Sequence, residues 1–357
     1  MRFPEFTDEW KRCTLEDCAD FLDGLRKPIK SEDRKCEKGL YPYYGASGII
    51  DYIDEYIFDG EYVLLSEDGA NILDRNYRVA FIARGKIWVN NHAHVLLPYK
   101  NIDINFLSEA LERLNYAIYN TGTTMPKLNQ EVCRKICLNI PSREEQNKIG
   151  NLLFLLNERI ATQNKIIEDL KKLKSAIYQE IFGSLVAQTL ELGQVAEIIK
   201  GKQVNGTELL EQGEYYVMNG GTTPSGWLNR YNTEANTISI SEGGNSCGYV
   251  QYNTSRYWSG GHCYSLRILH PQETLDLYLY HFLKWQEDNI MALRIGSGLP
   301  NIQKKDLLRF PVILPVINKQ KSIISILSVI DAKMACDILL TEHYVIQKKY
   351  LLRKLFI

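Results

Sequence analysis

Apolar residues recur at alternating intervals of four and three in two long stretches of the chain. The first stretch has eight apolar residues at ten such positions, and five heptads of this spacing are typical of a coiled-coil helix. Ser142, Arg143, Glu144 and Glu145 resemble a capping box, and Gly183 is a typical helix terminator. The pattern predicts a helix over residues 142–183, about 40 residues and roughly 60 Å long. Its seam positions are Ile149, Leu153, Leu156, Ile160, Gln163, Ile167, Leu170, Lys174, Ile177 and Ile181.

The second stretch predicts a helix over residues 316–357, with Asn318 as the best available N-cap. Seven of its ten seam positions are apolar: Ile323, Leu327, Ile330, Met334, Asp337, Thr341, Tyr344, Lys348, Leu351 and Leu355. Two such stripes are hidden most simply against each other, as an antiparallel coiled coil; the alternative is a pair of structural helices within a larger core. Polar seam residues set helix register at some cost in stability, so leucine at Gln163, Lys174, Asp337 and Lys348 is expected to raise the thermal midpoint.

The chain repeats itself at an offset of 174 residues. Residues 122–182 align without gaps onto residues 296–356, with ten identities in 61 positions. The matches include Gly122 with Gly296 and Pro126 with Pro300, which fix turns and are therefore not explained by a shared helical stripe. Weaker upstream echoes, such as residues 66–69 with 241–244, indicate that the whole chain is two copies of one unit.

Each copy begins with a globular part of mixed secondary structure. Short strands are predicted at 62–66, 79–82 and 87–89 and again at 237–241, 249–252 and 264–268, while 105–119 and 275–287 have helical spacing. The predicted fold class is α+β, with globular domains over 1–141 and 184–315, each followed by its long helix. Antiparallel helices would make a pseudo-two-fold dumbbell.

Composition excludes several classes of protein. With 45% hydrophobic and 24% charged residues, the 357-residue chain is an ordinary globular one. It shows no secretory h-region and no apolar stretch near the roughly 20 residues of a membrane span, so we expect a soluble, cytoplasmic protein without a membrane partner. Eight scattered cysteines are expected to be reduced thiols. The net charge of -1 gives no global sign of nucleic-acid binding.

Motifs of catalysis are missing from the sequence. There is no GxxxxGK[ST] loop, GxSxG elbow, HExxH helix, paired CxxC, S-adenosylmethionine loop or Asn-Pro-Pro-aromatic motif. His92 and His94 could lie on one strand face as metal ligands, but a lone pair of histidines is weak evidence for a site. We therefore expect no metal and no cofactor in this chain, and any catalysis in a partner.

Two globular units alternating with two repeated helices resemble the specificity (S) subunit of type I restriction-modification enzymes. The resemblance is carried by RFPEFTDEW at the start, by GTTMPKLNQEVCRKICLNIPSREEQNKIGNLL and KLKSAIYQEIF, and by GSGLPNIQKKDLLRFPVILPVINKQKSIISIL in the second copy. It implies that each globular unit is a target recognition domain that reads half of a bipartite site on double-stranded DNA. It also implies two modification (methyltransferase) subunits as partners and, for cleavage, ATP-driven restriction subunits. S-adenosylmethionine, Mg and ATP would belong to those partners. No second RFPxF-like segment follows Phe182, so the linker there departs from the pattern.

The residues that could contact DNA are predicted from the repeated loops. Base reading needs side chains with donors and acceptors, and local lysines would position phosphates. The leading candidates are Thr123, Thr124, Lys127, Ser297 and Asn301. Second candidates are Ser66, Asn91, His92, Ser241 and His262. The candidate phosphate contacts are Lys27, Lys30, Lys304 and Lys305.

Two other readings of the sequence remain open. A metal-dependent nuclease would use His92, His94 and an acid such as Asp68, and a purely structural coiled-coil scaffold would show no preference for DNA.

Overall fold

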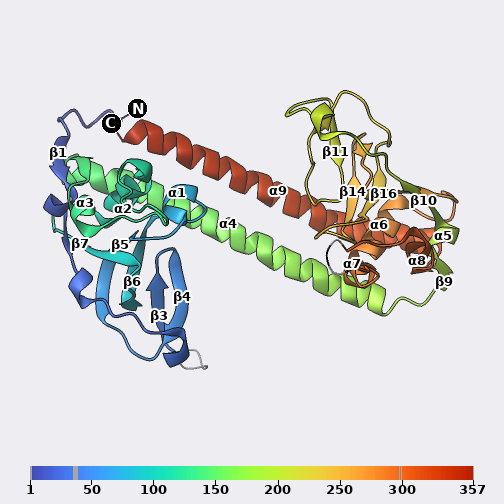
Figure 1. Cartoon of the computed structure of the whole chain (residues 1–357), viewed down its shortest axis with the longest axis horizontal. Helices are drawn as coiled ribbons and strands as arrows, with labels where there is room; N and C mark the ends of the chain where they lie inside the picture. The colour runs from blue at the N-terminus through green and yellow to red at the C-terminus, as the bar shows by residue number, and fades with distance from the viewer. Residues whose placement is uncertain (1, 35–38, 297, 299, 357) are drawn as a thin grey trace. The chain divides into compact units, whose positions relative to one another are not determined.

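The computed structural model describes residues 2–34, 39–296, 298 and 300–356, which form two compact units. Unit 1 is Met1–Asn164 with Leu339–Ile357, and unit 2 is Lys165–Ile338. The two long helices are α4 (Arg143–Gly183) and α9 (Ile317–Leu355). The boundaries of the units fall inside these helices, so each unit contains a part of both (Figure 1).

Unit 1 is built on a six-stranded sheet of order β2-β7-β5-β6-β3-β4. Its neighbouring strands are antiparallel except for β3 and β6, which run parallel. A separate pair, β1 with β8, brings the beginning and the end of the globular part together. The strands are β1 (Lys11–Thr14), β2 (Ala19–Phe21), β3 (Tyr41–Gly45), β4 (Gly48–Ile53), β5 (Phe58–Ser66), β6 (Ala80–Val89), β7 (Ala93–Pro98) and β8 (Cys137–Ile140). The helices are η1 (Leu15–Asp17), η2 (Asp23–Leu25), η3 (Ser31–Asp33), α1 (Asn71–Asp74), α2 (Ile104–Glu112), η4 (Tyr116–Ile118) and α3 (Gln130–Arg134).

Unit 2 repeats this topology in a shorter form. Its sheets are β10-β16-β13-β14, β12-β11-β15 and the pair β9 with β17. The long strand β6 of unit 1 corresponds to two short strands here, β14 and β15, and the sheet is therefore split. The strands are β9 (Gln188–Glu191), β10 (Ala196–Lys200), β11 (Tyr215–Met218), β12 (Trp227–Leu228), β13 (Thr237–Ser241), β14 (Val250–Asn253), β15 (Trp258–Ser259), β16 (Cys263–Ile268) and β17 (Pro311–Leu314). The helices are α5 (Leu192–Val195), η5 (Gly206–Glu208), α6 (Asp276–Trp285), α7 (Glu287–Met291) and α8 (Lys304–Leu308).

Each unit has its own core, and both long helices contribute to each core. In unit 1, Ile149 and Leu153 of α4 and Leu351 of α9 share a buried cluster with Phe106 of α2. Complete burial of such a side chain contributes roughly 1.5 to 3 kcal/mol. The beginning of α4 thus meets the end of α9, and the two segments run antiparallel in this unit.

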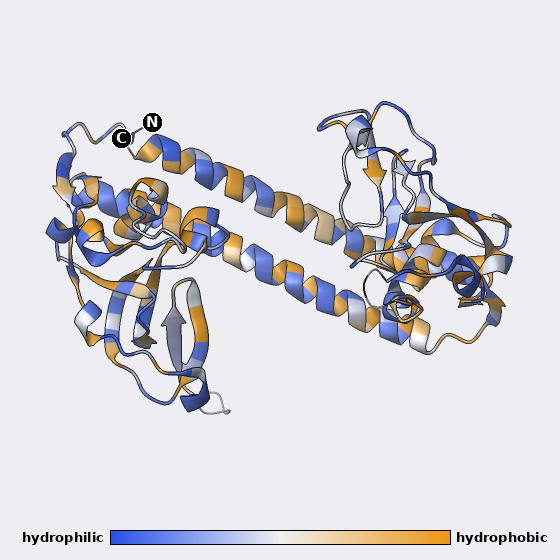
Figure 2. Cartoon of the chain, viewed as in Figure 1, coloured by the Kyte–Doolittle hydropathy of each residue, from blue (hydrophilic) through white to orange (hydrophobic). Residues whose placement is uncertain are grey.

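The complementary halves of the same helices meet in unit 2. Tyr178 and Phe182 near the end of α4 share a cluster with Ile323 and Leu327 near the beginning of α9, and with Phe282 of α6. The predicted α+β fold with two long antiparallel helices is confirmed. Apolar and polar residues alternate along both helices in Figure 2. The predicted seam residues are buried or half-buried: Ile149, Leu153, Leu156, Ile160, Ile167, Leu170, Ile323, Leu327, Ile330 and Met334.

The repeat is also visible in buried hydrogen bonds. Gln146 accepts from the backbone N–H of Asp103, at the start of α2, and donates to the carbonyl oxygen of Pro141. Gln320, 174 residues later, accepts from the N–H of Leu275, at the start of α6, and donates to the carbonyl oxygen of Pro315. One glutamine in each copy therefore fixes the long helix to the shorter helix beside it.

The starts of the long helices differ in part from the prediction. The Ser142 hydroxyl accepts from the N–H of Glu145 at 3.3 Å, as in a capping box. The Glu145 carboxylate does not return to the cap, because Arg2 holds it with two hydrogen bonds of 2.7 and 2.6 Å. Asn318 is not the N-cap of α9, because it already lies inside the helix, which begins at Ile317.

Candidate nucleic-acid interface

Four segments of unit 1 converge at the end of β5, and we call them the loop cluster. They are residues 45–48, 67–69, 90–92 and 121–127. Glu67 donates its backbone N–H to the carbonyl oxygen of His92, Gly69 donates to Pro126, and Leu128 donates back to Glu67. These main-chain bonds bring segments that are far apart in the sequence into one surface.

Unit 2 builds the same loop cluster with the same bonds. Glu242 donates its N–H to the carbonyl oxygen of His262, Gly244 donates to Pro300, and Ile302 donates back to Glu242. The segments are residues 219–226, 242–244, 260–262 and 295–301, of which 297 and 299 lie outside the described residues. The predicted DNA contact Ser297 is one of these two residues. The backbone frame is therefore shared by both units, whereas the side chains on it differ.

The segment 121–127 is a closed loop with an exposed tip. Thr121 donates both its N–H and its hydroxyl to the carbonyl oxygen of Lys127. The Asn120 side chain accepts from the N–H groups of Gly122 and Lys127, at 3.0 and 2.8 Å. Thr123 and Thr124 are exposed at the tip. Asn120 is not among the residues predicted from the sequence, although asparagine side chains commonly bond the backbone two residues on and so form turns.

Most of the predicted DNA contacts lie in the two loop clusters. Lys127 forms a bridge with Asp68 in unit 1, and Asn301 forms one with Gly243 in unit 2. A Cβ placed on Gly243 would lie 3.8 Å from Nδ1 of His262 and 3.9 Å from Cβ of Asn301, so these side chains are close neighbours. The following predicted contacts are exposed: Thr123, Thr124, Lys127, Asn301, Asn91, His92 and His262.

Ser66 and Ser241 correct the prediction. Only 1% of Ser66 and 4% of Ser241 is exposed. The Ser66 hydroxyl donates to the carbonyl oxygen of Ala46 at 2.5 Å, and the Ser241 hydroxyl donates to that of Gly220. In this structure neither hydroxyl is available to a base edge, so the two serines hold the cluster together and the prediction that they contact DNA is wrong.

These bonds identify a loop that the sequence reasoning missed. Ala46 belongs to the turn between β3 and β4, and Gly220 belongs to its counterpart after β11. Ser47 and the residues 222–225 are exposed there. The signal was a repeated Ser-Gly step, because Gly48 and Gly226 both have positive φ, at 127° and 157°.

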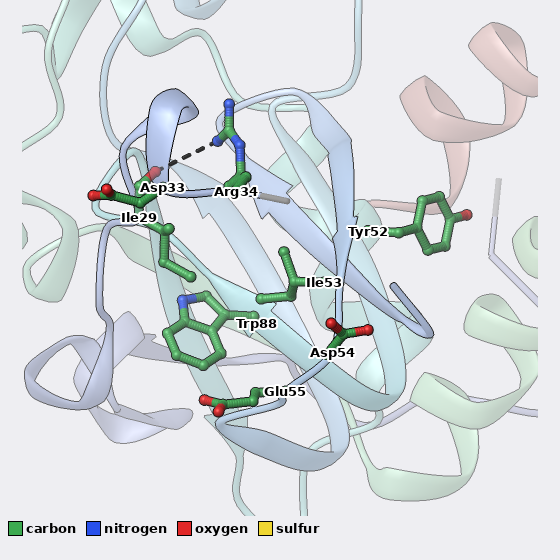
Figure 3. Close-up of a pocket in the computed structure, with 8 residues that line it drawn as sticks. All are labelled: Ile29, Asp33, Arg34, Tyr52, Ile53, Asp54, Glu55 and Trp88. Atoms are coloured by element: carbon green, nitrogen blue, oxygen red, sulfur yellow. Dashed lines mark hydrogen bonds between the residues drawn. The ribbon is translucent and has the colours of Figure 1, made fainter. Parts of the chain in front are cut away.

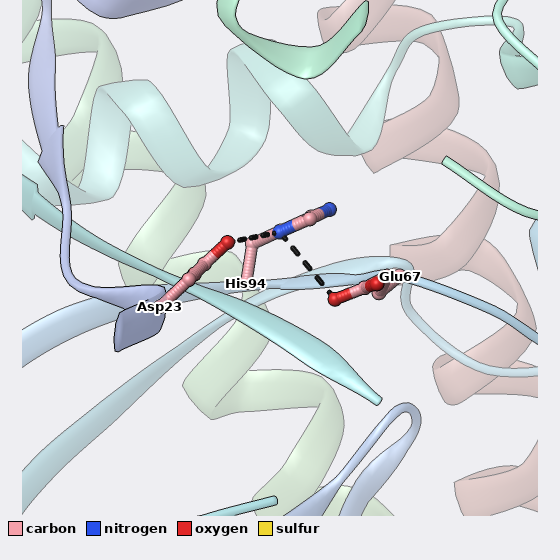
Figure 4. Close-up of side chains that lie close together, drawn as sticks. All are labelled: Asp23, Glu67 and His94. Carbon is pink, nitrogen blue, oxygen red and sulfur yellow. Dashed lines mark hydrogen bonds and ion pairs between the residues drawn. The ribbon is translucent and has the colours of Figure 1, made fainter. Parts of the chain in front are cut away.

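A network of charged side chains lies beneath the loop cluster of unit 1 (Figure 4). The buried His94 has its Nδ1 2.6 Å from Asp23 and its Nε2 2.8 Å from the carbonyl oxygen of Leu128. Both ring nitrogens face acceptors, so both carry a proton. Burial alone would lower the pKa of His94, but hydrogen bonds to Asp23 and Cys133 outweigh burial and raise the pKa to about 10. Arg26 completes the network with an ion pair to Glu67 at 2.7 Å.

This network includes the one group of three side chains, among the described residues, that is close enough for a metal ion: Asp23, Glu67 and His94. The donor set does not fit a metal, because His94 has no free lone pair and Arg26 already neutralises the carboxylates. His92 is directed elsewhere, with Nδ1 2.8 Å from Asp68. The two histidines therefore do not share a site. The hypothesis of a metal-dependent nuclease is left without the metal ligands that it requires.

Unit 2 has a different set of side chains at the equivalent place. The Tyr264 hydroxyl contacts Glu242 at 3.0 Å and the carbonyl oxygen of Ile302 at 3.1 Å. Lys200 pairs with the same glutamate at 2.7 Å. Tyr264 and Ile302 thus take the places of His94 and Leu128. A glutamate beneath the loops is common to both units, half-buried as Glu67 and buried as Glu242, and its partners differ.

Comparison with known proteins agrees with this duplicated architecture. A family model described as the type I restriction modification DNA specificity domain matches residues 7–172 and again residues 187–338. The chain belongs to this family. It is a type I specificity subunit, a DNA-recognition protein whose class is not catalytic.

Relatives of the specificity subunit come from several organisms. A candidate type I specificity subunit of Haemophilus influenzae is 27% identical over 344 residues, which cover 89% of this chain and 86% of the relative. The MjaVIII specificity subunit of Methanocaldococcus jannaschii is 26% identical over 60% of this chain and 52% of its own length. The crystal structure of the S subunit of Mycoplasma genitalium has 19% identity and a TM-score of 0.78 over 100% of this chain and 99% of that one, so the fold is shared.

The predicted phosphate contacts of the specificity subunit are exposed lysines on two segments. Lys27 and Lys30 are exposed on the segment that also supplies Arg26 to the network of unit 1. Lys304 and Lys305 are exposed at the start of α8, shortly after Asn301. Their positions are compatible with contacts to a DNA backbone.

A pocket at the far side of the β3–β4 hairpin is distinct from this surface (Figure 3). Ile29, Ile53 and Trp88 form its apolar wall, while Asp54 and Glu55 stand at its rim. An acidic rim repels phosphate, so we do not include this pocket in the interface.

Two further expectations concern the whole chain. The described helices include none whose length and hydropathy would let it span a bilayer. The cysteines among the described residues are free thiols, as expected: Cys13, Cys18, Cys133, Cys137, Cys247, Cys263 and Cys336.

Proposed function

We propose that the loop cluster of each unit reads one half of a bipartite double-stranded DNA site. The observation that carries this proposal is that the two units share the backbone frame of the cluster and differ in the side chains on it. One frame can then serve two different half-sequences. The bases are read by the exposed tips, with Thr123, Thr124 and Lys127 in unit 1 and Asn301 and His262 in unit 2.

The proposed contacts divide into two classes. Threonine, asparagine and histidine side chains offer the donors and acceptors that distinguish base pairs in the major groove. Lys27, Lys30, Lys304 and Lys305 contact phosphates, which positions the protein without reading sequence. The buried serines and the network around His94 hold the loops in place beneath these contacts.

We also propose that the subunit docks two modification (methyltransferase) subunits and, for cleavage, restriction subunits. Support comes from the family and from a structure with 15% identity and a TM-score of 0.54 whose title describes complex assembly of the type I system. In this proposal S-adenosylmethionine, Mg and ATP act only in the partners, and this chain needs no cofactor. Purification of the tagged chain from its native cell, followed by mass spectrometry, tests the proposal. Two methyltransferase subunits per chain support it, whereas a chain recovered alone contradicts it.

Exchange of a whole globular part tests whether the two units read their half-sites separately. Replacing residues 1–141 by those of another family member should change one half of the methylated site and leave the other half unchanged. A change in both halves would show that the two units do not read DNA separately.

A further inference from the structure

Unit 1 contains a basic groove outside its loop cluster. The groove has a volume of about 910 Å³ and lies between the segment after α1, the end of α2 and the facing sides of α4 and α9. Its cationic lining defines the name that we use for it: Arg75, Arg78, Arg113, Lys348, Lys349 and Arg353.

Carboxylates balance only part of this charge. Arg75 pairs with Glu112 at 3.1 Å, while Arg78 and Lys348 pair with Glu109 at 2.6 and 3.3 Å. The other three cations, among the residues that the structure describes, have no carboxylate partner: Arg113, Lys349 and Arg353. The basic groove therefore has an excess of positive charge available to an anionic ligand.

The basic groove opens at the same end of the sheet as the loop cluster. The loop segment 67–69 follows β5 directly, and α1 and then residues 75–78 follow that segment. The N–H groups of Val79 and Ala80 both donate to Glu112, which fixes the end of α2 at the start of β6. A duplex lying on the loop cluster would thus continue past α1 towards the groove.

The repeat shows that the basic groove is peculiar to unit 1. At the offset of 174, Lys349 and Arg353 correspond to Ser175 and Gln179. The cations are therefore present in the second copy of the repeat, on α9, and absent from the equivalent positions of the first copy, on α4. The groove is an addition to the common unit and is not needed to build the fold.

We propose that the basic groove binds the sugar-phosphate backbone of duplex DNA beside the half-site of unit 1. This inference rests on the proposed function of the loop cluster. Arginine, lysine, asparagine and tyrosine are the usual phosphate contacts, and Asn76 and the exposed Tyr77 lie next to the cations. Position beside the loops favours DNA over an acidic segment of a partner protein, which is tested as an alternative.

The test uses the full chain with Lys349→Gln and Arg353→Gln together, because both residues are exposed on α9 and glutamine preserves a helix. The probe is a short duplex of arbitrary sequence, titrated at several salt concentrations. Each phosphate contact contributes a slope of about 0.9 in log K against log salt. The double variant should therefore lower the slope by about 2 and the affinity at 0.1 M salt on the order of 50-fold.

The matched control is Lys319→Gln with Lys321→Gln, which removes the same charge from exposed positions of α9 in unit 2. The control should leave slope and affinity close to those of the native chain. Equal losses of salt slope and affinity in both double variants would show that net charge alone causes the effect. That result would overturn the inference.

Three other outcomes are informative, and the first two separate the inference from the proposed function. If the groove variant keeps the native salt slope while Thr123→Ala with Thr124→Ala still alters the methylated site, the groove inference fails and the loop cluster stands. If the groove variant keeps the native slope but no longer retains the methyltransferase subunits, the groove is a protein interface and the inference also fails. If the native chain shows no salt-dependent DNA binding, both proposals fail.

Discussion

At the scale of residues, the two units neutralise a glutamate beneath the loop cluster with different side chains. Each places a glutamate, Glu67 or Glu242, under its loop cluster. In unit 1 the doubly protonated His94 and Arg26 neutralise it, together with Asp23. In unit 2 a neutral Tyr264 donates to it, because burial and Glu242 keep the pKa of that hydroxyl well above its usual range. The glutamate of unit 1 thus depends on a buried, protonated histidine, whereas that of unit 2 has a neutral tyrosine and Lys200 as partners.

His94 gives the first prediction. Its pKa is about 10 in the folded chain and about 6.5 in an unfolded one, so the native state binds the extra proton between these values. The stabilisation is complete below about pH 6.5 and is lost as the pH rises through 10. Thermal unfolding of the native chain and of His94→Gln across this range should show the advantage of the native chain shrinking by a few kcal/mol, at about 1.4 kcal/mol per pKa unit. A constant difference between the two would contradict a charged His94.

Gly122 gives the second prediction. A Cβ on this residue would collide with the carbonyl oxygen of Met125, so Gly122→Ala must open the loop 121–127. We expect methylation by the assembled complex to fall at least tenfold with little change in the thermal midpoint, because the loop is exposed. The control is Gly24→Ala, where a Cβ meets no atom within 4 Å. Unchanged methylation in Gly122→Ala would show that the loop does not need this conformation.

At the scale of elements, the polar seam position Lys348 of α9 has a buried partner that the sequence could not show. Lys348 pairs with Glu109 of α2, and Asn157 donates to the same carboxylate at 2.8 Å. Burial opposes ionisation of Glu109, but Arg78 and Lys348 outweigh burial and lower its pKa. The expectation that leucine at four seam positions raises stability was made without these partners, and the structure reverses it for Lys348.

In unit 2 the charged groups between the long helices and the short helix α6 are arranged differently from those in unit 1. Lys174, the counterpart of Lys348, pairs with Asp331 of α9. His281 of α6 takes the place of Glu109, and burial and Lys174 lower its pKa to about 4, so it is neutral. The acid has moved from the short helix to the long one, while the lysine is the same in both copies.

The third prediction compares the two lysines. Lys348→Leu leaves the buried Glu109 short of one partner and should lower the free energy of unfolding by about 1 to 3 kcal/mol. Lys174→Leu should cost less, because the Asp331 side chain is 37% exposed and water can replace the lysine. Denaturant titration of both variants checks the order. In Lys348→Leu with Glu109→Leu the loss should be smaller than in the single lysine variant, and an equal or greater loss would contradict the ion-pair explanation.

The elements were predictable to different degrees, for physical reasons. The long helices could be predicted because the 4,3 spacing of Ile149, Leu153 and their successors reports a buried seam directly. The turn between β3 and β4 was missed because exposed Ile49 and Ile50 interrupt the alternation expected of a strand. The network of Asp23, Glu67 and His94 could not be predicted, since its members are up to 71 residues apart and only the sheet brings them together.

At the scale of the whole molecule, duplication explains both the fold and the role of the chain. One unit with a loop cluster and a long helix appears twice, and each unit contains a part of both long helices in its core. The repeat of glycines and prolines at offset 174 made the duplication visible in the sequence. The structure was needed to separate the exposed candidate residues at the loop tips from the buried ones that support the loops. Ser66 and Thr123 both carry a hydroxyl group, so the sequence alone does not distinguish their roles.

A map of the sites that the assembled complex methylates tests directly whether each loop cluster reads one half-site. We compare the native chain with two variants, Thr123→Ala with Thr124→Ala in unit 1 and Asn301→Ala with His262→Ala in unit 2. We expect each variant to relax or change one half of the bipartite site, a different half in each case, and to leave the other half as it was. Variants that change both halves together, or that change neither, would contradict it.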